Sequence, residues 1–139
     1  MIRLIREAKV KEGKVYLTFM LDTARLHNLA QMIRFRKKDG QIVAILGTSI
    51  VDYLSGGRLG GAREVTLDNL PEGVGVSWGI NLEVPANKAA ILAATASVAA
   101  SVCAAANKIR REAEDRLPKE WLFPKARVLC NGHAVPITE

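Results

Sequence analysis

Hydrophobic and polar residues alternate through the first 21 residues, which is typical of β-strands. Every second residue from Val15 to Leu21 is hydrophobic, and the turn-like sequence Lys-Glu-Gly-Lys at 11–14 separates this stretch from an earlier one. The pattern predicts a β-hairpin. A short helix that begins at Asp22 or Thr23 is expected to follow it.

A second hairpin is predicted around Asp39-Gly40, because this dipeptide accepts the positive φ angles of a two-residue turn at low cost. The register set by the turn places Phe35 opposite Ala44 and Ile33 opposite Leu46. The charged residues of the first strand then share the opposite face.

The sequence TSIVDYLSG at 48–56 predicts a short helix, capped by Thr48 or Ser49 and closed by Gly56. A continuous helix from Gln41 is an open alternative. Farther along, every second residue from Val74 to Val84 is hydrophobic, so we expect one long strand there. Its other face begins Gly-Ser-Gly at alternate positions, which leaves room for close packing.

Residues 86–117 contain no proline and are rich in alanine, and Pro118 follows, so we expect one helix of about thirty residues, roughly 45 Å long. Its large hydrophobic residues form one stripe. They are Ile91, Val98, Val102 and Ile109. The uncharged stretch 89–107 approaches the length of a membrane span, but it contains few large aliphatic residues. We therefore expect it to pack on a sheet or on copies of itself, and a membrane is not the expected partner.

The tail at 118–139 is predicted to be an arm outside a single domain at 1–117. Trp121, Leu122 and Phe123 give it an apolar anchor, and Asn131-Gly132 predicts a hairpin. Together these elements predict an α+β fold. An antiparallel sheet built from hairpins carries one long alanine-rich helix, and a C-terminal hairpin or arm follows.

Composition adds a basic character, with a formal net charge of +6 and a pI of about 9.6. Residues 1–55 carry ten Lys and Arg against five Asp and Glu, whereas residues 56–139 carry ten against nine. The excess charge therefore lies in the first part of the chain. It is concentrated on Arg34, Arg36 and Lys38, which strand alternation would align about 7 Å apart, a spacing suited to phosphates. A charged edge strand that discourages aggregation explains the same residues equally well.

The glycine-rich sequence SGGRLGGA at 55–62 resembles a phosphate loop only in composition. A phosphate loop needs a Lys-Ser or Lys-Thr pair and a helix N-terminus after it, whereas the residues that follow here predict a strand. We interpret the segment as a flexible connector or as a loop that contacts a partner. In the second case, Arg58 provides the polar contact and Leu59 the apolar one.

Cys130 and His133 are the pair that most resembles a nucleophile and its base, because the predicted turn places them opposite each other. No third residue is evident to orient the histidine, and no second Cys/His pair completes a metal site. Cys103 is expected to be a small buried apolar residue. Two cysteines are too few for a disulfide framework, and the first residues do not resemble a signal peptide, so we expect a reduced intracellular protein.

The sequence therefore favours a non-enzymatic structural subunit of a large assembly, such as a virion, capsid or other shell, located in the cytoplasm or in the virion if viral. Its partners would be copies of itself or neighbouring subunits, and no cofactor is expected. One alternative is a nucleic-acid-binding protein that uses the basic strand face. The other is a small cysteine-dependent enzyme.

Overall fold

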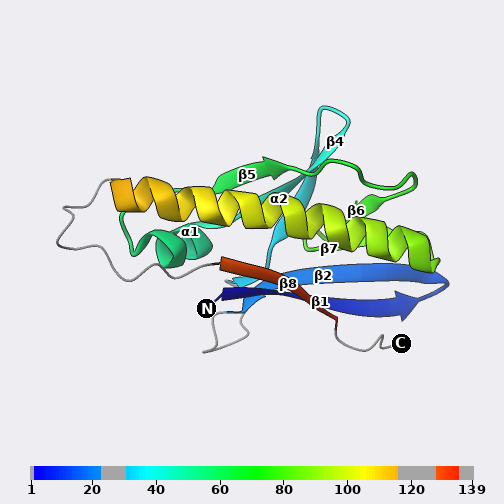
Figure 1. Ribbon diagram of the computed structural model, residues 1–139. Helices are drawn as coiled ribbons and strands as arrows, with labels where there is room; N and C mark the ends of the chain where they lie inside the picture. Colours follow the sequence, from blue (N-terminus) through cyan, green and yellow to red (C-terminus); the bar gives the residue numbers. More distant parts are fainter. Residues whose placement is uncertain (1, 23–30, 116–127, 135–139) are drawn as a thin grey trace.

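The computed structural model describes residues 2–22, 31–115 and 128–134. The elements in chain order are β1 (Ile2–Lys11), β2 (Lys14–Asp22), β3 (Arg34–Lys38), β4 (Gln41–Leu46), α1 (Thr48–Ser55), β5 (Arg63–Thr66), β6 (Gly75–Ser77), β7 (Asn81–Val84), α2 (Lys88–Asp115) and β8 (Val128–Ala134). Figure 1 shows α2 running along the whole length of the molecule. The fold is α+β, as the sequence predicts.

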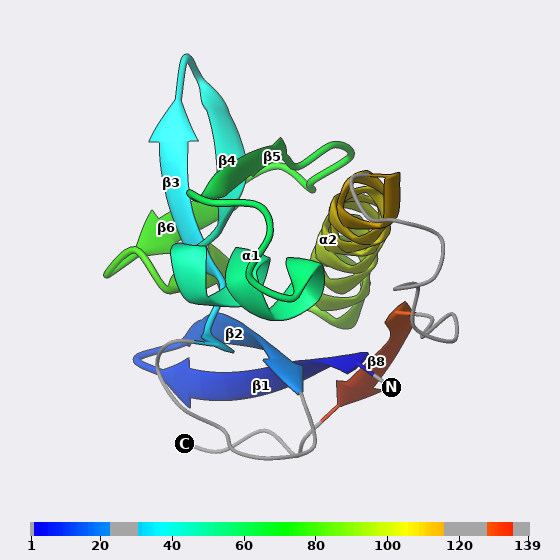
Figure 2. The ribbon, with the colours of Figure 1, turned by 90° about the vertical axis from the view of Figure 1, so that its left-hand side faces the viewer.

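The strands form two sheets. The larger sheet has the order β6-β7-β2-β1-β8, and the smaller one has the order β3-β4-β5. All neighbouring strands are antiparallel except β8, which pairs parallel with β1. In Figure 2, α1 and α2 lie between the two sheets, so the helices have sheet on both sides.

Both predicted N-terminal hairpins are present, and each turns on a two-residue loop with positive φ at both positions. Glu12 and Gly13 form the first turn, and Asp39 and Gly40 the second. The second turn sets the predicted register, in which Phe35 lies opposite Ala44. The alternative of a helix starting at Gln41 is therefore wrong, because these residues form β4.

The core lies where the two sheets and α2 meet. Alternate residues of β2 face it, as the pattern predicts, and all are at most 3% exposed: Val15, Leu17, Phe19 and Leu21. The ring of Phe19 meets that of Phe35 edge to face, with centroids 5.9 Å apart. Since these rings come from different sheets, their contact helps to hold the two sheets together.

The short helix is α1, which ends where the sequence predicts. Gly56 takes the left-handed conformation that terminates it. Its N-cap is Gly47, without a side-chain hydrogen bond, so the expected capping by Thr48 or Ser49 is wrong.

The single strand predicted from Val74 to Val84 is wrong, because a turn at Trp78-Gly79 divides it into β6 and β7. Trp78 has a φ of 58° and Gly79 a φ of 69°. Ile80 N–H donates to the carbonyl of Ser77 across the turn at 3.3 Å. The glycine that suggested a bare strand face is thus the second residue of a hairpin turn.

The long helix is unbroken over the 28 residues of α2, about 42 Å. Asn87 caps it, since the side-chain Oδ1 accepts a hydrogen bond from Ala90 N–H at 2.7 Å. Val98, Val102 and Ile109 of the predicted stripe are buried in the core. Ile91 packs against the same cluster.

The predicted C-terminal hairpin is wrong in its turn, because the residues on both sides of Asn131-Gly132 belong to one strand, β8. The register of β8 against β1 shifts between the pairs Arg3–Leu129 and Ile5–His133. The Asn-Gly pair lies in this irregular stretch and not at a reversal of the chain. Part of the predicted arm is thus a strand of the larger sheet. The division of the chain at residue 117 stays a prediction.

Candidate interaction surfaces

The basic residues of β3 share one exposed face, as the alternation predicts. Arg34, Arg36 and Lys38 are exposed, while Phe35 between them is 1% exposed and faces the core. Phe35 is the one buried residue of β3, since Lys37 on the same side of the strand is also exposed.

A carboxylate from β5 lies across this basic face. Glu64 Oε1 accepts a hydrogen bond from Arg36 Nη2, and Oε2 lies 2.9 Å from Lys38 Nζ. The hydrogen bond from Lys38, together with the nearby charges, holds the pKa of Glu64 below its ordinary value. Two of the three cations thus already have an acidic partner, while Arg34 has no ion pair among the described residues. Nucleic-acid binding by this face stays a prediction.

The leucine of the glycine-rich loop, Leu59, was expected to contact a partner but lies elsewhere. Gly57 N–H donates to the carbonyl of Asp52 at 2.8 Å, which ends α1 and turns the chain. Leu59 N–H then donates to Ser55 Oγ at 3.2 Å, and the Leu59 side chain is 2% exposed and packs in the core. The structure therefore places Leu59 in the core of its own chain, where its side chain is not exposed for the predicted partner contact.

Arg58, next to that leucine, is exposed, and its predicted partner contact stays a prediction. The loop leads into β5, and β5 is a strand, as the sequence indicates. A phosphate loop would need a helix N-terminus at this position.

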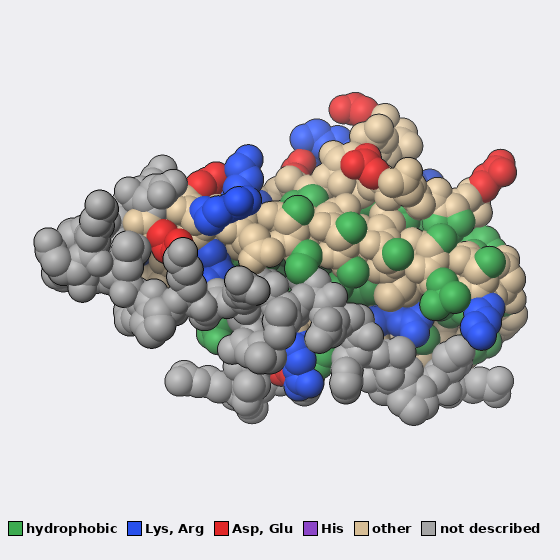
Figure 3. Space-filling model, viewed as in Figure 1, with side chains coloured by type: hydrophobic (Ala, Val, Ile, Leu, Met, Phe, Trp, Pro, Cys, Tyr) green, Lys and Arg blue, Asp and Glu red, His purple; other side chains and the backbone are tan. Residues whose placement is uncertain are grey.

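The outer face of α2 is a row of exposed or half-buried small and apolar residues. We call it the alanine strip, and it consists of Ala89, Leu92, Ala93, Ala96, Ala100 and Ala104. Figure 3 shows it from outside: hydrophobic side chains follow the helix, with Lys and Arg side chains at both ends. Among the described helices, α2 is long and apolar enough to cross a membrane, and one third (33%) of its most apolar stretch is buried.

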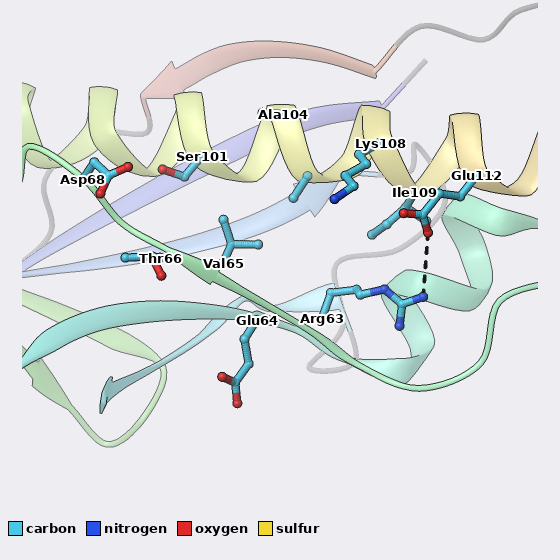
Figure 4. Close-up of a pocket in the computed structure, with 11 residues that line it drawn as sticks. Arg63, Glu64, Val65, Thr66, Asp68, Ser101, Ala104, Lys108, Ile109 and Glu112 are labelled. Atoms are coloured by element: carbon cyan, nitrogen blue, oxygen red, sulfur yellow. Dashed lines mark ion pairs between the residues drawn. The ribbon is translucent and has the colours of Figure 1, made fainter. Parts of the chain in front are cut away.

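Two adjoining hollows lie between the alanine strip and the chain around β5, with volumes of about 450 and 620 Å³. Asp68, Ser101 and Ala104 line both. In Figure 4, the side chain of Val65 points from β5 toward α2. Arg63 forms an ion pair with Glu112, in which Nη2 lies 4.0 Å from Oε2. Together the hollows form one groove along the helix, which we call the β5–α2 groove.

A hydrogen bond from Ser97 fixes the chain to α2 at one end of the groove. Its hydroxyl donates a hydrogen bond to the carbonyl of Asp68, just after β5. This bond ties the chain to α2 beyond the strand, while the ion pair of Arg63 and Glu112 ties the two elements near its start. Between these ties the small side chains of α2 leave the floor of the groove bare.

The cysteine and histidine pair is not opposed across a turn, because Cys130 and His133 lie along the same strand, β8. Their side chains lie outside the described set. Cys103 is half-buried on α2 and disulfide-bonded, so the expectations of a buried Cys103 and of a reduced protein are wrong. In the part of the chain that the structure describes, no three potential metal ligands lie together.

Trp121, Leu122 and Phe123 lie outside the described residues, and the anchor that they were predicted to form stays a prediction. Sequence reasoning missed two features. Glu64 gave no signal, because it lies 26 residues from Lys38 along the chain. The turn at Trp78, which is 89% exposed, could have been suspected from one residue, the glycine that follows it.

Comparison with protein-family models, curated proteins and solved structures gives no match to this chain. The interpretation of function therefore rests on the surfaces above.

Proposed function

We propose that this protein is a non-enzymatic structural subunit of a larger assembly and that it associates through the outer face of α2. The observation that carries the proposal is the alanine strip, which is uncharged from Ala89 to Ala104 and lies on a helix that spans the molecule. A shell or capsid component, in the cytoplasm or in a virion, is the concrete case.

The physical argument is that burying the apolar surface of the strip against a partner is more favourable than leaving it exposed to water. Burying apolar surface contributes roughly 25 cal/mol per Å², and a contiguous apolar patch usually marks an interaction site. Small side chains also let a second backbone approach closely, which increases the number of dispersion contacts. Leu92, 55% exposed, adds the largest single apolar group to the strip.

The two alternatives have weaker support. Glu64 already compensates Arg36 and Lys38, which lowers the net charge that the β3 face offers to phosphates. The cysteine-dependent enzyme would be built around Cys130 and His133, which lie along one strand, β8, and do not face each other across a turn. Both remain proposals of lower rank.

The test is sedimentation at physiological salt of the full chain, of Ala100→Glu in the strip, and of Ala62→Glu as the control. Ala62 is also exposed but lies in the glycine-rich loop. We expect the wild type and Ala62→Glu to sediment as oligomers, and Ala100→Glu to sediment near the chain mass of 15.1 kDa, because each copy would place a charge in the interface.

A wild-type chain that sediments as a clean monomer at all concentrations would overturn the proposal. If that monomer also floats with phosphatidylcholine vesicles, the strip is a membrane-binding surface. Circular dichroism of all three proteins confirms that each is folded.

A further inference from the structure

The turn between β6 and β7 exposes an aromatic ring that packing within the chain does not explain. Trp78 is 89% exposed, and its φ of 58° lies in the region that bulky residues rarely take. Its neighbours in the turn, Ser77 and Gly79, have no large side chain that would cover the ring. An unfavourable backbone conformation of this kind costs stability and persists mainly at functional sites. The indole ring is therefore a candidate binding surface.

The same turn is fastened to the basic strand β3. Phe35 N–H donates to the carbonyl of Gly79 at 2.8 Å, and a Cβ added at Gly79 would lie 3.8 Å from the carbonyl oxygen of Phe35. β3 contacts both β6 and β7, and Figure 2 shows it beside β6. Trp78 precedes Gly79 and the exposed Arg34 and Arg36 flank Phe35, with about 3.8 Å between successive Cα atoms. The ring and the two arginines thus belong to one region of the surface.

The positive charge of this region is only partly neutralised. Glu64 pairs with Arg36 and Lys38, whereas Arg34 has no ion pair among the described residues. Because alternate residues of a strand share a face, the three cations stand about 7 Å apart in a row. Such a row suits the phosphates of an extended nucleic-acid strand. The region therefore combines an aromatic face with a line of cations.

We propose that Trp78 and β3 bind single-stranded nucleic acid, with one base stacked on the indole ring and the neighbouring phosphates on Arg34 and the rest of the basic row. Stacking on an aromatic side chain, together with cations that follow the backbone, is the usual basis of such binding. Double-stranded DNA does not offer this contact, since its bases already stack on each other. The inference goes beyond the proposed function, and neither depends on the other.

The surroundings of the ring favour nucleic acid over an anionic membrane. Insertion into a membrane interface needs a substantial apolar face, and Trp78 is a single apolar side chain at its turn. The other exposed large hydrophobic residues of the described chain, Tyr53 and Leu92, lie on α1 and α2. The cations also form a row along one strand, which matches a linear polyanion.

The test is fluorescence anisotropy of a short labelled oligothymidylate, titrated with the full chain at several salt concentrations. We expect Trp78→Ala to weaken binding about tenfold with an unchanged salt dependence, because it removes stacking and no charge. Arg34→Ala should weaken binding and also reduce the slope of log K against log salt by about 0.7, the contribution of one phosphate contact on a single strand. Tyr53→Ala and Arg111→Ala are the matched controls, exposed on α1 and near the end of α2, and should change neither quantity.

Glu64→Gln gives an expectation of opposite sign. Loss of the carboxylate releases Arg36 and Lys38 for phosphates, so the affinity should rise and the salt dependence should become steeper. A merely structural role of Glu64 would not strengthen binding.

Tryptophan fluorescence reports the stacking directly. Saturating oligothymidylate should quench the emission of the wild type but not that of Trp78→Phe, which keeps an aromatic ring and should keep most of the affinity. Trp78→Asn should lose affinity as Trp78→Ala does, although asparagine accepts the positive φ and does not destabilise the turn. Loss of binding in Trp78→Asn therefore cannot be attributed to unfolding.

The inference is wrong if the wild type does not bind the oligothymidylate or if Trp78→Ala binds it as tightly as the wild type does. Flotation with vesicles that contain phosphatidylserine separates the membrane alternative. If the wild type floats, Trp78→Ala does not, and the oligothymidylate is not bound, the turn is a membrane-binding surface and the nucleic-acid inference is overturned.

Discussion

At the scale of single residues, Trp78 stands out because a bulky residue rarely takes a positive φ. Gly79, its neighbour in the turn, accepts a hydrogen bond from Phe35 N–H at 2.8 Å, so the turn is fastened to β3. The fastening holds the backbone in a conformation that tryptophan disfavours but asparagine accepts.

We expect Trp78→Asn to raise the free energy of unfolding by about 1 kcal/mol, because the Trp78 side chain is almost wholly exposed and its loss removes little packing. Urea denaturation followed by circular dichroism measures this. Trp78→Ala is the control and should change little, since alanine shares the backbone penalty. A clear loss of stability in Trp78→Asn would contradict the prediction.

Glu64 differs from Trp78 in that its contribution to stability depends on its charge. Because Lys38 and Arg36 lower the pKa of Glu64 in the folded protein, its ion pairs stabilise the fold at neutral pH. This stability is present above the ordinary pKa of 4.5 and is lost as the pH falls through the lowered folded pKa. Urea denaturation of wild type and Glu64→Gln should show a difference at pH 7 that vanishes well below pH 4.5. A difference that persists in acid would show that packing, not charge, is responsible.

At the scale of elements, α2 has two faces of the same small residues with opposite roles. Ala94 is 0% exposed and lies against the core, whereas Ala96, two residues later, lies on the alanine strip. Alanine fits the inner face because the core around it is closely packed. The outer face has room for a larger side chain.

Ala94→Leu should therefore lower the free energy of unfolding by about 1 to 3 kcal/mol through overpacking. Ala96→Leu should leave it within about 0.5 kcal/mol when measured at a concentration where the protein is monomeric. Thermal or urea denaturation of the two variants decides. Equal losses would mean that both faces of α2 are packed within one chain.

At the scale of the whole molecule, the two sheets are joined mainly by side chains and one helix. Phe19 and Phe35 meet between them, an isolated β-bridge links Met20 to Met32, and Phe35 N–H donates to the carbonyl of Gly79 at 2.8 Å. The smaller sheet ends at β5 with a free edge beside α2.

The sequence by itself determined the elements whose signal is local. Asp39-Gly40 selected its turn and register, the alternation through Leu17 and Phe19 gave the buried face of β2, and the absence of proline gave the unbroken α2. In each case the decisive residues are neighbours in sequence or lie at a regular spacing, so their preferences act before any tertiary contact forms.

Tertiary structure decided what depends on residues far apart in the chain. Only the fold brings Glu64 to Lys38, and only the turn after Ser55 carries Leu59 into the core. Periodicity also could not distinguish one strand from two at Trp78, because a hairpin preserves the alternation on both sides of its turn. These contacts depend on which elements pack together, and the local pattern of side chains does not determine that packing.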